Sequence, residues 1–138
     1  MGSVPVHLYF GFAWIAFALA IAVHVADEAK HDFLSVYNPT VRAVRKRVPL
    51  LPLPTFSFPV WLGGLIAGVL LLLLLSPLAF DGDYRLRLIA WPLAVIIGIG
   101  NALLHFAGSV YFRRWMPGVY SAPILMIAAV CLLAAASR

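Results

Sequence analysis

Four long apolar stretches divide the chain of 138 residues. They cover residues 7–29, 59–80, 86–112 and 117–136. The length of each is close to that of a helix that crosses a bilayer, which needs about 20 residues at a rise of about 1.5 Å per residue. The pattern predicts an all-α protein, a four-transmembrane-helix bundle that forms one membrane domain over residues 1–138.

Polar and turn-forming residues separate these stretches. Prolines recur in the connection over residues 38–58, and each removes a backbone hydrogen-bond donor, so we expect an extended or re-entrant segment in the membrane interface. The segment could act as a lid over a cavity, and a simple linker explains the pattern equally well. We expect a tight turn at residues 81–83 and a fourth helix that begins at Pro117.

The composition agrees with a membrane protein. Hydrophobic residues make up 64% of the chain and charged residues 11%, far below the roughly 25% of soluble domains. The net charge of +5 comes from short basic runs beside apolar stretches, which favours contact with lipid headgroups over nucleic acid. The lipid bilayer is therefore the expected partner, and the single Cys131 permits no disulfide within the chain.

The basic residues also predict the topology. Seven fall on one side of a four-span arrangement and three on the other; the seven are Lys30, Arg42, Arg45, Lys46, Arg47, Arg113 and Arg114, and the three are Arg85, Arg87 and Arg138. Because basic loops face the cytoplasm, we expect both termini to lie away from it. The first and third spans then run parallel.

Ionisable residues gather where the first apolar stretch ends. Residues 24–32 hold two of the four histidines and three of the five acidic residues. His24 and Glu28 are four residues apart, as are Asp27 and His31, so on a helix these side chains share a broad face. The spacing Glu28-x-x-His31 is also one by which helical bundles bind a metal ion.

The third span brings a second imidazole to the same depth. Asn101 and His105 are its strongly polar residues before Arg113. His105 lies about 12 Å along the helix from Arg113, and His24 lies about 9 Å from Lys30, so parallel helices would let the two imidazoles meet. The simpler explanation is that residues 27–32 form the wetted end of a helix and that the two histidines are hydrogen-bonded core residues.

These residues carry a resemblance to a known family. His24-x-x-Asp27-Glu28, then Asn101-x-x-x-His105 and a later Pro-Gly, resemble the HXXEE-domain family of small bacterial membrane proteins. The chain departs from the motif in one place, since Asp27 stands where the family has Glu. The resemblance implies a shared site and a bacterial inner membrane, and it names no reaction.

We expect the site to hold a divalent metal, with zinc, iron or manganese the candidates for imidazole and carboxylate ligands. His24, Glu28, His31 and His105 are the predicted ligands. Asp27 and Glu28 are the predicted catalytic carboxylates, and Asn101 would orient a ligand or the substrate.

The predicted function is that of a metal-dependent membrane enzyme acting on a lipid or isoprenoid-like substrate near the cytoplasmic leaflet. One alternative is a metal-free isomerase or terpenoid cyclase, in which Asp27 or Glu28 protonates a double bond. Another is a proton- or cation-coupled transporter, which would need a homo-oligomer to form a pathway in so small a bundle. The last alternative is a lipid-binding or assembly protein that catalyses no reaction.

Overall fold

The computed structural model describes residues 5–138, which contain helices and no strand, so the predicted all-α class is confirmed for this range. Residues 1–4 of the predicted single domain lie outside it. The helices are α1 (Val6–Lys30), α2 (Leu34–Arg47), α3 (Phe58–Leu74), α4 (Ser76–Phe80), α5 (Tyr84–Pro92), the π-helix η1 (Leu93–Gly100), α6 (Asn101–Phe112) and α7 (Ala122–Ala136).

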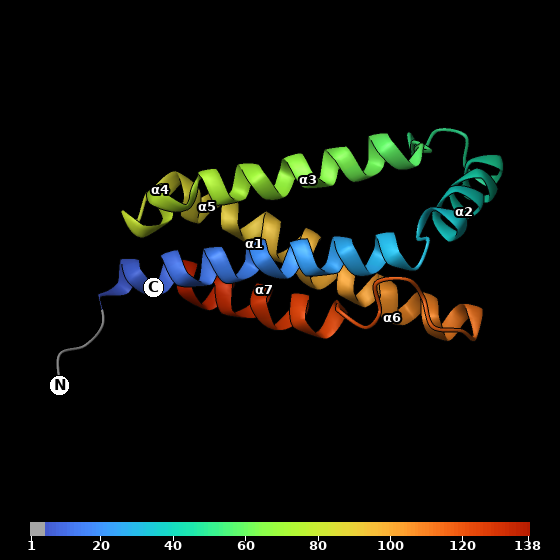
Figure 1. Cartoon of the computed structure of the whole chain (residues 1–138). Coiled ribbons are helices and arrows are strands. Elements are labelled where there is room, and N and C mark those ends of the chain that lie inside the picture. Colours follow the sequence, from blue (N-terminus) through green and yellow to red (C-terminus); the bar gives the residue numbers. More distant parts are fainter. Residues whose placement is uncertain (1–4) are drawn as a thin grey trace.

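The long helices lie side by side along one axis, and α2 crosses one end of the bundle at an angle (Figure 1). The chain passes up α1, back along α3 and α4, up again through α5, η1 and α6, and back along α7. The first and third apolar stretches therefore run parallel. The C-terminus returns to the start of α1, where the Arg138 guanidinium lies 5.6 Å from the centre of the Tyr9 ring.

Two of the helices are long and apolar enough to cross a membrane, namely α1 and the continuous helix Tyr84–Phe112. The other two apolar helices, α3 and α7, have 17 and 15 residues. The predicted second span divides at Leu75, just before the α4 turn that contains Pro77. Two membrane-length helices give weak support for a membrane location, and the four-span arrangement remains a prediction.

The apolar core forms mainly where α1 packs against α7, α4 and α3, and where α7 packs against η1. Phe10, Trp14 and Phe17 of α1 are almost fully buried, as are Leu125 and Leu132 of α7. Burying side chains of this size stabilises the fold by roughly 1.5–3 kcal/mol each. This core aligns α1 with its neighbours and thereby sets the position of the polar residues at its end.

The helix that carries His105 is widened before it reaches the site. Pro92 lacks the backbone N–H of a regular turn, and the π-helix η1 follows directly. A wider turn changes the register, so the residues after Gly100 face a different direction from the one that an unbroken α-helix would give. Gly98 is essential to this packing, because a Cβ there would lie 2.3 Å from Cβ of Ala129.

The proline-rich connection differs from the prediction. Residues 38–47 belong to α2, which contains Pro39, and only residues 48–57 are non-helical. A proline in a helix removes one backbone hydrogen bond, and α2 tolerates this loss at an exposed position. The Asn38 amide holds the following segment by two hydrogen bonds to the backbone of Phe56, of 2.9 and 3.1 Å.

The start of the last helix also differs from the prediction. Pro117 lies in a series of turns, and α7 begins at Ala122 with Pro123 in its first turn. Gly118 has a φ of +88°, a left-handed conformation that glycine adopts without strain. These turns fold residues 116–121 back against the ends of α1 and α6, where the histidines lie.

Candidate metal centre

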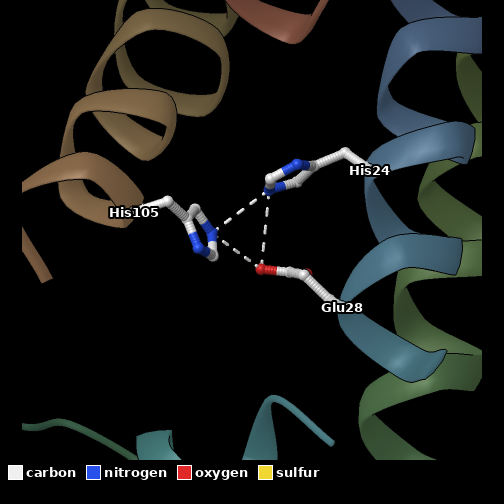
Figure 2. Close-up of side chains that lie close together, drawn as sticks. All are labelled: His24, Glu28 and His105. Carbon is white, nitrogen blue, oxygen red and sulfur yellow. Dashed lines mark hydrogen bonds and ion pairs between the residues drawn. The ribbon is translucent and has the colours of Figure 1, made fainter. Parts of the chain in front are cut away.

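Three buried side chains from two helices meet at one point (Figure 2). His24 and Glu28 come from successive turns of α1, and His105 comes from α6. His24 Nε2 lies 3.2 Å from His105 Nε2 and 3.5 Å from Glu28 Oε1, and His105 Nε2 lies 3.0 Å from Glu28 Oε1. All three residues are at most 5% exposed.

The spacing of these three atoms matches that of metal ligands. Zn²⁺ is bound by histidine nitrogen and carboxylate oxygen at about 2.0–2.2 Å, so two ligands of a tetrahedral site lie roughly 3.3 Å apart. The observed separations are 3.0, 3.2 and 3.5 Å. Two imidazoles and one carboxylate also form the three-ligand set of known catalytic zinc and iron sites, which leaves a coordination position for water or substrate. His24, Glu28 and His105 could therefore hold one divalent ion.

A chain of hydrogen bonds fixes the orientation of the His24 ring. Its Nδ1 lies 2.9 Å from Ser121 Oγ, and that hydroxyl donates to Asp27 Oδ2 at 2.8 Å. Because the hydroxyl hydrogen goes to the carboxylate, His24 Nδ1 must carry the proton that Ser121 accepts. The lone pair of His24 therefore lies on Nε2, the atom that faces Glu28 and His105, as in metal-binding histidines whose second nitrogen is held by an outer partner.

Asp27 is fully engaged outside the three-residue cluster. Its Oδ2 accepts from both the backbone N–H and the hydroxyl of Ser121, at 3.0 and 2.8 Å. Its Oδ1 lies 2.8 Å from His31 Nδ1. With both oxygens occupied, Asp27 serves to position Ser121 and His31, and is not placed as a ligand or as a free general base.

His31 does not join the cluster, contrary to the prediction from the Glu28-x-x-His31 spacing. The helix α1 ends at Lys30, so His31 is its C-cap, and the side-chain spacing of a continuing helix no longer applies. Its ring turns back to Asp27, whose backbone oxygen also lies 2.9 Å from His31 Nδ1. The ring is 40% exposed.

Asn101 lies beside the cluster at the first residue of α6. Its Nδ2 donates to His24 Nε2 over 3.0 Å, which agrees with a lone pair on that nitrogen. It also lines a hollow between α2 and α6 that reaches His105. Asn101 thus lies where it could contact a ligand in this hollow, and its role in orienting a ligand or the substrate stays a prediction.

The turn before α7 closes the site from the other side. A Cβ at Gly118 would lie 2.6 Å from His105 Cε1 and 2.9 Å from Glu28 Cγ, so only glycine fits there. Ser109 ties this turn to α6, since its hydroxyl donates to the His105 carbonyl and accepts from the Met116 N–H. His105 Nδ1 is buried beside the turn and has no hydrogen-bond partner among the described residues.

The structure brings together His24, Glu28 and His105, three of the four ligands that the sequence predicts. Ser121 and Gly118, which hold His24 in place and close the site, were not predicted from the sequence. The Pro-Gly pair was visible in the sequence, although it was interpreted as the start of a helix. No signal in the sequence distinguishes Ser121, because it is 97 residues from His24 and lies in no motif.

Comparisons with known proteins add the family and nothing further. Residues 14–133 match the model of a family described as a protein of unknown function with HXXEE motif. A search of curated proteins and a search of solved structures each found no match. Of the residues at the motif positions, His24 and Glu28 belong to the cluster, and Asp27 lies beside it and holds Ser121. Because the match covers most of the chain, the protein belongs to the HXXEE family.

Proposed function

We propose that this protein is a metal-dependent membrane enzyme that acts on a lipid or isoprenoid-like substrate. The observation that carries the proposal is the buried triangle of His24 Nε2, Glu28 Oε1 and His105 Nε2, with sides of 3.0 to 3.5 Å. A buried carboxylate and two imidazoles are costly unless they are paired or bind an ion. A divalent ion of zinc, iron or manganese would satisfy all three, and when bound it would activate water for hydrolysis or support oxygen chemistry.

The membrane part of the proposal is a four-span bundle, in which α3 with α4, and α7 with the turns before it, complete the crossing that α1 and α6 begin. Large apolar side chains on the outer faces support it, among them Leu70, Leu74 and Leu104 at 55%, 77% and 71% exposure. Exposed apolar surface on this scale is typical of a protein in contact with lipid or a partner. The proposal puts the α2 end, which carries seven basic residues, near the cytoplasmic leaflet of a bacterial inner membrane, with the site at that end and both termini on the far side.

The residues around the cluster have distinct tasks in this proposal. Ser121 and Asp27 hold the His24 ring so that Nε2 would face the ion. A metal would take the Nε2 lone pair, so the Asn101 amide that now donates to it would turn to the substrate or to a metal-bound water. The hollow beside His105 is mostly apolar, which suits a hydrocarbon chain. Buried polar residues of the described chain gather mainly at this end of the bundle, which disfavours a transport pathway from one side to the other.

A metal-free acid–base enzyme, an isomerase or a terpenoid cyclase, is the second candidate. The contact of 3.0 Å between His105 and Glu28 favours it, because a hydrogen-bonded imidazole and carboxylate can exchange a proton in a dry pocket. In this case Glu28 is the acid, since both oxygens of Asp27 are engaged. Activity that survives exhaustive chelation would favour this candidate.

The test is the metal content of the purified protein, measured by mass spectrometry of the elements. Wild type should carry about one equivalent of a divalent metal, and His24→Ala and His105→Ala should carry almost none. His7→Ala is the matched control, because His7 is an exposed histidine at the opposite end of α1. Metal-free wild type, or unchanged content in both site variants, would overturn the metal proposal.

The enzymatic part needs a second measurement. Lipid extracts of cells that express wild type, His105→Ala or His7→Ala are compared by mass spectrometry. A lipid consumed or formed with wild type and His7→Ala, and unchanged with His105→Ala, supports turnover at this site. If the extracts from all three strains are identical and wild type carries metal, the protein binds metal without lipid turnover, and the enzymatic part of the proposal is overturned.

A further inference from the structure

An apolar groove runs along one face of α6, beside the proposed metal centre. Its volume is about 290 Å³, and α2 forms its other wall. Asn101, Leu104, His105, Gly108 and Phe112 line it along α6, a distance of about 16 Å from the first to the last of these residues. His105 and Asn101 thus line a groove whose walls are mostly apolar.

A second hollow of about 210 Å³ adjoins this groove, and Val36 and Met116 line both. Its other walls are more polar and carry a fixed positive charge, since Arg114, His31, Ser35 and Tyr120 line it. Arg114 is exposed and has no carboxylate within 4.0 Å among residues 5–138. Its guanidinium is therefore available to bind an anion.

The charge balance at this end of the bundle points the same way. Seven of the ten Lys and Arg residues lie there, in the set Lys30, Arg42, Arg45, Lys46, Arg47, Arg113 and Arg114. The acidic residues at this end are Asp27, Glu28 and Asp32, and the first two are engaged with histidines. No Lys or Arg in the described range forms a salt bridge with a carboxylate. The excess positive charge selects anionic over neutral or cationic ligands.

We propose that the site binds an amphiphile of the bilayer with an anionic headgroup, which lies in the hollow of Arg114 while its hydrocarbon chain lies in the groove along α6. This proposal rests on the proposed function and names the substrate class. Val36 and Met116 line both hollows, so the two hollows lie next to each other, and in this proposal one molecule passes these side chains and occupies both. His105 and Asn101 line the groove and not the hollow of Arg114. The part of the ligand beside the metal centre would therefore be its hydrocarbon chain.

The test compares a pair of ligands that differ only in charge, an alkyl phosphate and the alcohol of the same chain length. Binding is measured to the full-length protein in nanodiscs of neutral lipid, with empty nanodiscs as the reference for partition. Wild type should bind the phosphate at least about 10-fold more tightly than the alcohol, because the anion gains a charge-assisted contact with Arg114. Equal affinity for the two ligands would overturn the proposal.

Two variants with the same loss of charge locate the headgroup. Arg114→Gln should weaken phosphate binding by about 10-fold and leave the alcohol unchanged. Lys46→Gln removes a charge at the same end of the molecule and lies in neither hollow, so it should change both affinities by less than about twofold. Equal losses in the two variants would show attraction by the general field and overturn the assignment to Arg114.

Variants of the groove locate the chain. Gly108→Leu adds a side chain toward Met116, whose Cγ lies 3.2 Å from the position of a Cβ, and it should weaken both ligands by about 10-fold. Leu104→Ala shortens a residue that is 71% exposed, so the fold tolerates it, and it should weaken both by about threefold. Full affinity in both variants would show that the hydrocarbon chain does not lie in the groove.

A further control adds inorganic phosphate at millimolar concentration. If it competes with the alkyl phosphate, the site binds a water-soluble anion, and the proposal that the ligand is a lipid is overturned.

Metal content is measured on the same samples, so that the two proposals can fail separately. A wild type that carries metal and does not distinguish phosphate from alcohol overturns this inference alone. A metal-free wild type that still prefers the phosphate supports this ligand class and overturns the metal-dependent function. Gly108→Leu should retain its metal, which shows that the variant has folded.

Discussion

At its N-terminal end α1 packs through aromatic rings, whereas at its C-terminal end it packs through hydrogen bonds. Phe10 and Trp14 are buried among apolar neighbours, and Gly11 lies directly against the Phe80 ring. Four turns further along the same helix, His24 and Glu28 are equally buried and contact polar atoms of α6 and of the turn before α7. The same helix is thus packed in an apolar core at one end and in a polar cluster at the other.

The difference separates stability from function. Apolar burial stabilises a fold in proportion to the area removed from water, whereas buried polar groups at best offset the cost of their own desolvation. The aromatic end therefore accounts for the packing of α1, whereas the proposed metal would account for the polar end. Changes at the first end should alter stability alone, and changes at the second should alter metal content.

The largest effect is expected from Glu28→Gln, which removes the only carboxylate of the cluster. A neutral amide is a poor ligand for zinc or iron. Loss of a residue that only orients a ligand lowers metal affinity by up to roughly 100-fold, and loss of the ligand itself should lower it by more. Asp81→Asn, in the turn at the opposite end, is the matched loss of charge and should leave affinity unchanged. Titration with zinc followed by a competing chelator measures both. Unchanged affinity in Glu28→Gln would remove Glu28 from the set of ligands.

Two glycines with positive φ, one at each end, give the next contrast. Ala at Gly118 (φ +88°) or at Gly82 (φ +72°) should cost about 1–2 kcal/mol of stability through the left-handed backbone. Only at Gly118 does the new Cβ also push against His105 and Glu28, so Gly118→Ala should lower metal affinity by about 100-fold. Thermal unfolding and zinc titration on both variants separate the two effects. Equal metal affinity in the two variants would show that the turn before α7 does not shape the site.

A smaller effect is expected from Ser121→Ala, which breaks the link between His24 and Asp27. Losing a partner that orients a metal-binding histidine costs typically 10- to 100-fold in affinity. Ser137→Ala is the control, because Ser137 donates only to the Leu133 carbonyl at the far end of α7. Zinc titration should show the loss in Ser121→Ala alone. An unchanged value there would mean that the His24 ring is held by packing.

The sequence predicts the helical class and the meeting of His24 with His105, because both follow from local patterns. The apolar stretches predict the helices, and the spacing of each histidine from the basic residues that follow it predicts that the two imidazoles lie at a similar level. The position of His31 could not be predicted in the same way. It depends on where α1 ends, and a helix terminus is decided by neighbouring contacts more than by spacing.

Other features depend on contacts that are distant in the sequence. Pro39 predicts an interruption, yet α2 continues through it as an exposed helix. Ser121 is one serine among several, and only the turn at Gly118 brings it to His24 and Asp27. The widened η1 changes the direction of Asn101 and His105, and a proline such as Pro92 in the sequence is equally compatible with a simple kink.

The smallest effect tests whether the two ends of α1 are independent. Trp14 donates a hydrogen bond of 2.7 Å from Nε1 to the Leu72 carbonyl, and Trp14→Phe removes it while keeping an aromatic ring in the core. The loss of one such bond should cost about 1 kcal/mol of stability, with metal affinity unchanged, because Trp14 lies almost three helical turns from His24. Trp115→Phe, at a residue 71% exposed near the site, should leave stability within about 0.5 kcal/mol. Thermal unfolding in detergent measures the first quantity and zinc titration the second. A fall in metal affinity in Trp14→Phe would mean that aromatic packing at one end positions the histidines at the other, so that α1 would act as a single rigid unit.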